Sequence, residues 1–190
     1  MGRRLTQGRY AAALTVLEHL ERWLRKGEKM ARPKVRVREA TEADVASVVE
    51  LSSALFQEDG GQRDPWMNLD WPKQEGAAYY SGHISGEDSL CLLAEVGDRV
   101  VGFLTGYVRG WSNLRPIRLA ELESMFVTEE YRGGGIGAQL VREFVEWCRG
   151  KRVEGISVTA YWANEGALRF YRRLGFEPRN VTLEWGEDAV

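Results

Sequence analysis

The residues with the clearest chemical meaning form one glycine-rich run, Tyr131-Arg132-Gly133-Gly134-Gly135-Ile136-Gly137-Ala138. An alternating segment, 119–127, precedes this run, and an apolar segment with helical spacing, 136–148, follows it, which predicts a strand, a glycine turn and a helix. Glycines let backbone N–H groups approach a ligand closely, and the first turn of a helix adds unpaired N–H groups and a partial positive charge. The run therefore predicts a binding site for a pyrophosphate or a similar anion.

The same glycines also fit a dinucleotide-binding pattern, in which Gly133, Gly135 and Ala138 make the turn and Glu154 contacts a ribose. The strand before the turn counts against this interpretation, because it alternates polar and apolar residues, whereas a central parallel strand is apolar throughout. The run also comes late in the chain and leaves too little sequence for the rest of a doubly wound sheet. We therefore favour a different fold.

Two carboxylates, Glu121 and Glu123, precede the glycine run on the predicted strand 119–127. Residues two apart in a strand face the same way, so we expect both on one face, together with Met125 and Val127. If that face lines a cleft, one carboxylate could accept a proton from an amine. The alternatives are an acidic lining that attracts a cationic amine, or a solvated pair.

Periodicity and turn signals predict a single domain of mixed α and β structure. The predicted strands cover 35–39, 90–96, 99–109, 119–127, 155–161 and 176–185, with a hairpin between the second and third. The predicted helices begin at the capping-box pattern 41–44, at about residue 76, at residue 136 and at Asn164, and Gly175 ends the last one. Residues 57–76 are predicted to form a long loop.

Residues 1–33 are predicted to be a helical extension, and residues 34–190 the domain itself. Leu14, Leu17, Leu20 and Leu24 have helical spacing in the extension, before Gly27 and Pro33 end the pattern. The segment could be a packing helix, sequence upstream of a later start at Met30, or a partner-binding helix.

Composition narrows the classes of function. A formal net charge of -2 gives no global cationic field for nucleic acid or a membrane surface. No apolar stretch is long enough to span a membrane and no secretory signal opens the chain, so we expect a cytoplasmic protein. Cys91 and Cys148 lie in apolar segments and are interpreted as buried thiols. His19 and His83 are interpreted as surface residues. The His and Cys residues do not have the spacing of a metal site.

Two stretches resemble the GNAT superfamily of acetyl-CoA-dependent N-acetyltransferases. Arg132-Gly133-Gly134-Gly135-Ile136-Gly137 fits the pattern R/Q-x-x-G-x-G/A, and Asn164-Glu165-Gly166-Ala167-Leu168-Arg169-Phe170-Tyr171-Arg172-Arg173-Leu174-Gly175-Phe176 fits N-x-x-A-x-x-x-Y-x-x-x-G-F. The resemblance covers about 35–185. It implies a mixed α and β fold whose central, mostly antiparallel sheet is splayed at a cofactor cleft and flanked by helices.

The resemblance also implies roles for residues. Backbone groups of Phe126 and Val127 would pair with the pantetheine arm of acetyl-CoA, and Asn164 would contact that arm or only cap its helix. The pyrophosphate would be held by N–H groups of Arg132, Gly133, Gly134, Gly135, Ile136, Gly137 and Ala138. Glu121 is the predicted base, and Glu123 is the second candidate. Tyr171 is the predicted acid for the leaving thiolate, with a core tyrosine as the alternative.

The predicted function is transfer of an acetyl group to a primary amine by direct attack in a ternary complex, without a covalent enzyme intermediate. The acceptor would be a small cationic amine, such as an aminoglycoside-like compound or a polyamine, or a protein amine. Glu58, Asp59 and Trp66 suit a cationic amine by charge and by cation–π contact, although they could be only a polar loop. A non-catalytic acyl-CoA-binding sensor or interaction module is the alternative function, and a homodimer is possible.

Overall fold

A computed structural model describes residues 34–186, so the predicted extension 1–33, with His19, lies outside the described residues. Five strands form one sheet in the order β1-β2-β3-β4-β5. They are β1 (Val35–Glu39), β2 (Ser89–Val96), β3 (Arg99–Arg109), β4 (Leu119–Val127) and β5 (Gly155–Val158). The first four strands pair antiparallel and β4 pairs with β5 in parallel, which confirms the mostly antiparallel sheet.

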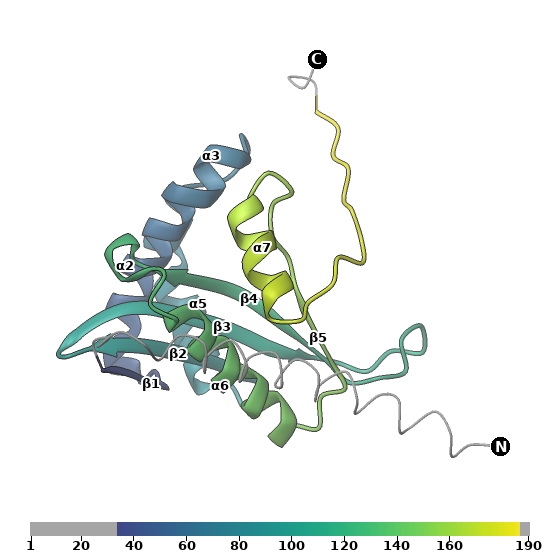
Figure 1. Ribbon diagram of the computed structural model, residues 1–190, viewed down its shortest axis with the longest axis horizontal. Coiled ribbons are helices and arrows are strands. Elements are labelled where there is room, and N and C mark those ends of the chain that lie inside the picture. The colour runs from purple at the N-terminus through teal and green to yellow at the C-terminus, as the bar shows by residue number, and fades with distance from the viewer. Residues whose placement is uncertain (1–33, 187–190) are drawn as a thin grey trace.

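Helices cover both faces of this sheet, as Figure 1 shows. One face carries α6 (Ile136–Gly150), and the other carries α2 (Val45–Leu55) and α5 (Gly76–Ser85). Short elements lie between these strands and helices: η1 (Glu42–Asp44), η2 (Phe56–Gly60), α3 (Gly61–Arg63), α4 (Trp71–Gln74) and η3 (Glu129–Tyr131). A further helix, α7 (Glu165–Arg173), follows β5. The mixed α and β class is therefore confirmed.

The apolar stripe predicted for α6 is buried, because its residues recur every three or four positions and so share one side of the helix. It packs against the sheet with the inner side chains of β2, β3 and β4. The buried stripe residues are Ile136, Leu140, Val141, Phe144, Val145 and Cys148. This packing fixes the direction in which the N-terminus of α6 points.

A bulge in β4 changes which side chains share a face. Thr105 of β3 lies opposite Ser124 and Gly106 lies opposite Leu122, so Glu123 is an extra residue in β4. Met125 therefore packs with Leu122 in the core under α6. The prediction that Glu121 and Glu123 share a face with Met125 and Val127 is wrong, because simple alternation holds only where the register is continuous.

The parallel pairing of β4 with β5 is short. It joins Leu119–Leu122 to Gly155–Val158, and β4 then continues to Val127 with no strand of the described residues beside it on that side. The strand predicted for 155–161 thus ends three residues early. The sheet is open along the last five residues of β4, which agrees with the predicted splay.

The prediction of a long loop at 57–76 is wrong over much of its length, because η2, α3 and α4 lie within it. Two glycines allow the chain to fold back on itself here. A Cβ atom on Gly60 would lie 3.0 Å from Met67, and one on Gly61 would lie 3.1 Å from Leu69. The sequence pattern marked these glycines as loop residues, whereas they are sites of close helix packing.

The strand predicted for 176–185 is also wrong, since this segment forms no regular secondary structure. Val181 and Leu183 are exposed, and Figure 1 shows the segment running away from the sheet. Alternating residues predict strand conformation, but a strand also needs a partner, and no pairing to the outer edge of β5 occurs among the described residues.

Gly106 tests the packing of α6 on the sheet. A Cβ atom there would lie 2.5 Å from the Phe144 ring and 2.6 Å from the backbone oxygen of Glu121, which cannot move aside. We expect Gly106→Ala to lower the free energy of unfolding in urea by about 1–3 kcal/mol. Gly82→Ala is the control, because α5 leaves open space there. Equal stability of the two variants would contradict the close approach.

Candidate functional site

A cleft of about 490 Å³ opens where β5 leaves β4. Its walls come from the end of β4, the glycine turn, the first turn of α6, η2 and α7. Of the predicted site residues, the cleft is lined by Glu58, Asp59, Glu123, Phe126, Val127, Arg132, Gly133, Gly135, Ile136, Gly137, Ala138, Asn164 and Tyr171. Glu121, Gly134 and Trp66 are not among its lining residues.

The glycine turn presents backbone donors to this cleft. Gly133 and Gly135 have φ angles of 74° and 90°, a left-handed conformation that favours glycine. No side chain caps α6 at Gly135, and the first helical hydrogen bond runs from Gln139 N to Gly135 O at 3.0 Å. The N–H groups at the start of α6 precede that bond, and the space around Gly133 is open. This donor set fits a diphosphate.

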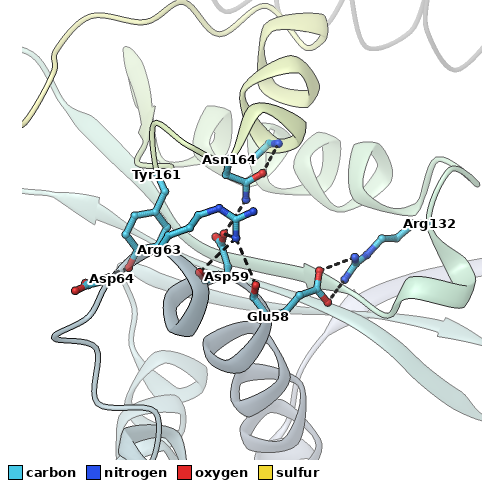
Figure 2. Close-up of polar contacts among 8 residues, drawn as sticks. Glu58, Asp59, Arg63, Asp64, Arg132, Tyr161 and Asn164 are labelled. Carbon is cyan, nitrogen blue, oxygen red and sulfur yellow. Dashed lines mark hydrogen bonds and ion pairs between the residues drawn. The ribbon is translucent and has the colours of Figure 1, made fainter.

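Arg132 is already engaged with a carboxylate (Figure 2). Its two terminal nitrogens donate to both Glu58 oxygens at 2.6 and 2.7 Å, and its Nε donates to the Val127 carbonyl at 2.7 Å. The guanidinium also lies over the Phe126 ring, 5.1 Å from its centroid. The Glu58 pairing raises the pKa of Arg132. Because this ion pair is exposed, it contributes at most about 1 kcal/mol to the stability of the folded protein. A more highly charged anion can therefore replace Glu58 beside Arg132.

A second contact crosses the cleft at Asn164 (Figure 2). The Asn164 Oδ1 atom accepts from Ala167 N at 3.0 Å and so caps α7, while Nδ2 donates to the Asp59 carboxylate at 2.8 Å. Arg63 donates to the same Asp59 oxygen at 2.7 Å. Asn164 therefore starts α7 and ties it to η2, and the predicted cap is confirmed.

Asp64 extends this row of contacts, because Tyr161 donates to its carboxylate at 3.3 Å. We call Glu58, Asp59 and Asp64 the acidic strap. Two of its residues were predicted to bind the acceptor, but in the structure each has a cationic or amide partner on the far side of the cleft. The third predicted acceptor residue, Trp66, is 54% exposed.

The two glutamates of β4 have different surroundings. Glu121 lies 3.2 Å from the Arg109 guanidinium and 3.4 Å from the Tyr107 hydroxyl. Glu123 accepts a hydrogen bond from Tyr79 and lies within 3.4 Å of the Thr105 hydroxyl. Only Glu123 lines the cleft, so the structure separates two residues that the sequence placed together.

His83 lies beside Glu123, with its Nε2 atom 3.4 Å from a carboxylate oxygen. Its side chain is only 11% exposed, so its interpretation as a surface residue is wrong. Sequence reasoning also missed Tyr79, which stands four residues earlier on α5 and therefore on the same side of the helix. That spacing, in front of a strand with two glutamates, was the available signal.

Tyr171 enters the cleft from α7. Its ring meets the edges of Phe170 and Phe176, with centroids 5.1 and 5.6 Å away. Burial, and secondarily the charge of Asp59, raises the pKa of its phenol well above the usual value. Tyr171 thus stays protonated and presents an O–H donor.

Membrane insertion, metal binding and cysteine nucleophiles are less well supported by residues 34–186. No described helix has the length and apolar character to cross a bilayer. In the same part of the chain, no cluster of three or more His, Cys, Asp or Glu residues is arranged to hold a metal ion. Cys91 and Cys148 are buried free thiols, and burial raises the pKa of each to about 12, which suppresses the reactive thiolate.

Residues 45–176 match the family model described as Acetyltransferase (GNAT) family. An uncharacterised N-acetyltransferase of Methanocaldococcus jannaschii is 28% identical over 78% of the chain, and the chain spans 63% of that relative, less than two thirds of its length. The N-alpha-acetyltransferase RimI of Mycobacterium tuberculosis is 31% identical over 72% of the chain and 75% of its own length.

Solved structures share the fold. A transcriptional regulator of Bacillus halodurans superposes with a TM-score of 0.67 at 25% identity, covering 80% of this chain and 99% of that one. The aminoglycoside N-acetyltransferase AAC(6')-Iy, solved in complex with CoA, superposes with a TM-score of 0.67 at 16% identity, covering 82% and 96%. At that identity the second likeness concerns the fold alone.

Asn164 tests the contact between α7 and η2. We expect Asn164→Ala to lower the free energy of unfolding by more than the roughly 1 kcal/mol that an N-cap contributes, because the Asp59 contact is lost as well. Asn164→Ser keeps a capping oxygen and is expected to lose less. A Ser variant as stable as the wild type in urea denaturation would show that the Asp59 contact adds no stability.

Proposed function

The chain belongs to the GNAT acetyltransferase family, and we propose that it transfers an acetyl group from acetyl-CoA to a primary amine by direct attack in a ternary complex. One observation carries this proposal. The glycine turn, Glu123 and Tyr171 all line the same cleft. A donor set for the cofactor, a proton acceptor and a proton donor are thus within one site.

Bound acetyl-CoA would supply the activated acetyl group as a thioester. The first N–H groups of α6, with Arg132 beside them, would hold its diphosphate. Phe126 and Val127 lie on the part of β4 that no strand covers, so their backbone can take the amides of the pantetheine arm in place of a strand. Asn164 stands across the cleft from them. Together these contacts would orient the thioester toward the end of β4.

The reaction needs two proton transfers, one from the attacking amine and one to the departing sulfur. Glu123 would accept the proton of the incoming ammonium, directly or through water, so that the neutral amine can attack. Its position in the cleft supports it over Glu121, which ranked first by sequence spacing but pairs with Arg109. Tyr171 would donate its hydroxyl proton toward the departing sulfur, a role that its raised pKa supports by keeping it protonated.

The acceptor would be a cationic primary amine. Glu123 lines the cleft, and its carboxylate favours a positively charged partner. Relatives and structural neighbours act on amines of two kinds, namely the alpha-amine named for RimI and the aminoglycosides named for AAC(6')-Iy. We therefore propose an aminoglycoside-like compound, a polyamine or a protein amine.

Thiol release from acetyl-CoA against a panel of these amines tests the activity. A protein that binds CoA but releases no thiol with any amine would favour the alternative function, an acyl-CoA-binding sensor or interaction module. Thiol release with one amine class would assign the acceptor.

Substitutions test the assigned roles. We expect Glu123→Gln to lower kcat/KM for the best amine by about 100-fold or more, the usual effect of losing a general base. Glu121→Gln is the matched control and should lower it less than about tenfold. Tyr171→Phe should lower kcat with little change in the KM for acetyl-CoA. A larger loss from Glu121→Gln than from Glu123→Gln would reverse the assignment.

Glu58 tests whether Arg132 receives the cofactor phosphate. Because Glu58 occupies the guanidinium in the free protein, Glu58→Gln should tighten CoA binding by about twofold to fivefold, the range of an exposed ion pair. Arg132→Ala should weaken it. The control is Glu165→Gln, which removes one carboxylate from the exposed pair with Arg169. Calorimetry that finds unchanged affinity in Glu58→Gln would argue against competition for Arg132.

A further inference from the structure

His83 is a buried side chain that the chemistry above does not use. Its ring lies between two tyrosines, with centroids 4.7 Å from Tyr79 and 6.1 Å from Tyr107. The Nε2 atom faces Glu123 at 3.4 Å, and the opposite ring nitrogen, Nδ1, is buried without a hydrogen-bond partner among residues 34–186. The ring is therefore held in place by packing and presents one nitrogen to the carboxylate.

These surroundings determine where the imidazole proton lies. An ionised carboxylate only accepts hydrogen bonds, so the nitrogen that faces Glu123 must carry the proton for the contact to be favourable. An imidazolium would also place an N–H group at Nδ1, where nothing accepts it. Burial lowers the pKa of His83, although the charge of Glu123 opposes this. The neutral tautomer with the proton on Nε2 satisfies all three conditions.

We propose that His83 is a positioning residue of the acetyl-transfer site, a neutral imidazole whose Nε2–H holds the Glu123 carboxylate toward the cleft. The inference rests on the proposed function of Glu123. Tyr79 and Thr105 donate to the same carboxylate, so donors from α5 and β3 surround it on the side away from the cleft. The bulge in β4 is what brings Glu123 within reach of all three.

The contact also affects protonation. The titratable groups that interact with Glu123 are Tyr79, Tyr80 and His83 from α5 and Tyr107 from β3. The tyrosines are neutral near pH 7, since burial raises the pKa of each. A donated hydrogen bond favours the charged form of a carboxylate, so an Nε2–H group on His83 stabilises ionised Glu123.

Two variants of His83 separate positioning from packing. His83→Phe keeps an aromatic ring between the tyrosines and removes the donor, whereas His83→Gln restores an N–H group of similar reach. We expect His83→Phe to lower kcat/KM for the amine by about tenfold or more, with an unchanged KM for acetyl-CoA, and to move the acidic limb of the pH profile to higher pH. His83→Gln should recover most of the rate and the original limb.

A wild-type pH profile in His83→Phe would overturn the inference. Equal losses in both variants without a shift of the limb would also overturn it, because they indicate a purely structural role. Urea denaturation of each variant establishes that it is folded.

A measurement on the free protein separates this inference from the proposed activity. Nitrogen-15 NMR of His83, assigned with His83→Gln, should show the neutral Nε2–H form at pH 7 and a titration midpoint below the usual histidine pKa. Glu123→Gln should shift the His83 resonance. A proton on Nδ1, or titration near pH 6.5, would contradict the inference even if the enzyme is active. If no amine releases thiol while these spectra hold, only the proposed function fails.

Discussion

The short pairing of β4 with β5 is the constraint on which the rest of the site depends. It ends at Leu122 and Val158, and the bulge in β4 adds Glu123 as the next residue. The strand is thus irregular on one side and uncovered on the other at the same point. Because an uncovered strand leaves N–H and C=O groups without partners, this stretch needs a ligand or water to complete its hydrogen bonds. The cleft, the candidate base and the proposed cofactor arm all meet there.

The chain is nearly neutral overall, and the charged side chains of the cleft also pair with partners close by. The glycine turn, the N-terminus of α6 and Arg132 make one wall positive, and Glu58 of the acidic strap pairs with that wall, whereas Asp59 and Asp64 contact Asn164 and Tyr161. In the free protein Glu58 pairs with Arg132, and Asp59 accepts a hydrogen bond from Asn164 across the cleft. An anionic ligand must compete with Glu58, but an exposed pair offers weak competition. The strap therefore holds η2 near α7 without closing the anion site.

Most elements could be predicted from local patterns, because their causes are local. The stripe of α6, the capping box at Thr41–Asp44 and the Gly97 turn of the hairpin each depend on a few neighbouring residues. Predictions that required knowledge of a distant partner were wrong. The alternation at Val181 and Leu183 predicted a strand, but no strand lies beside it among the described residues. The glycines at 60 and 61 indicated a loop, whereas they pack against Met67 and Leu69.

The sequence alone determined the glycine turn before α6, since glycine spacing and the start of an apolar helix are properties of consecutive residues. It also placed Asn164 and Tyr171 on one short helix. Only the tertiary structure distinguishes the surroundings of Glu121 and Glu123, because at the bulge Glu123 lines the cleft while Glu121 pairs with Arg109. It also brought His83 to Glu123 from a helix 40 positions earlier in the chain. Contacts between distant elements depend on how those elements pack, which no local pattern records.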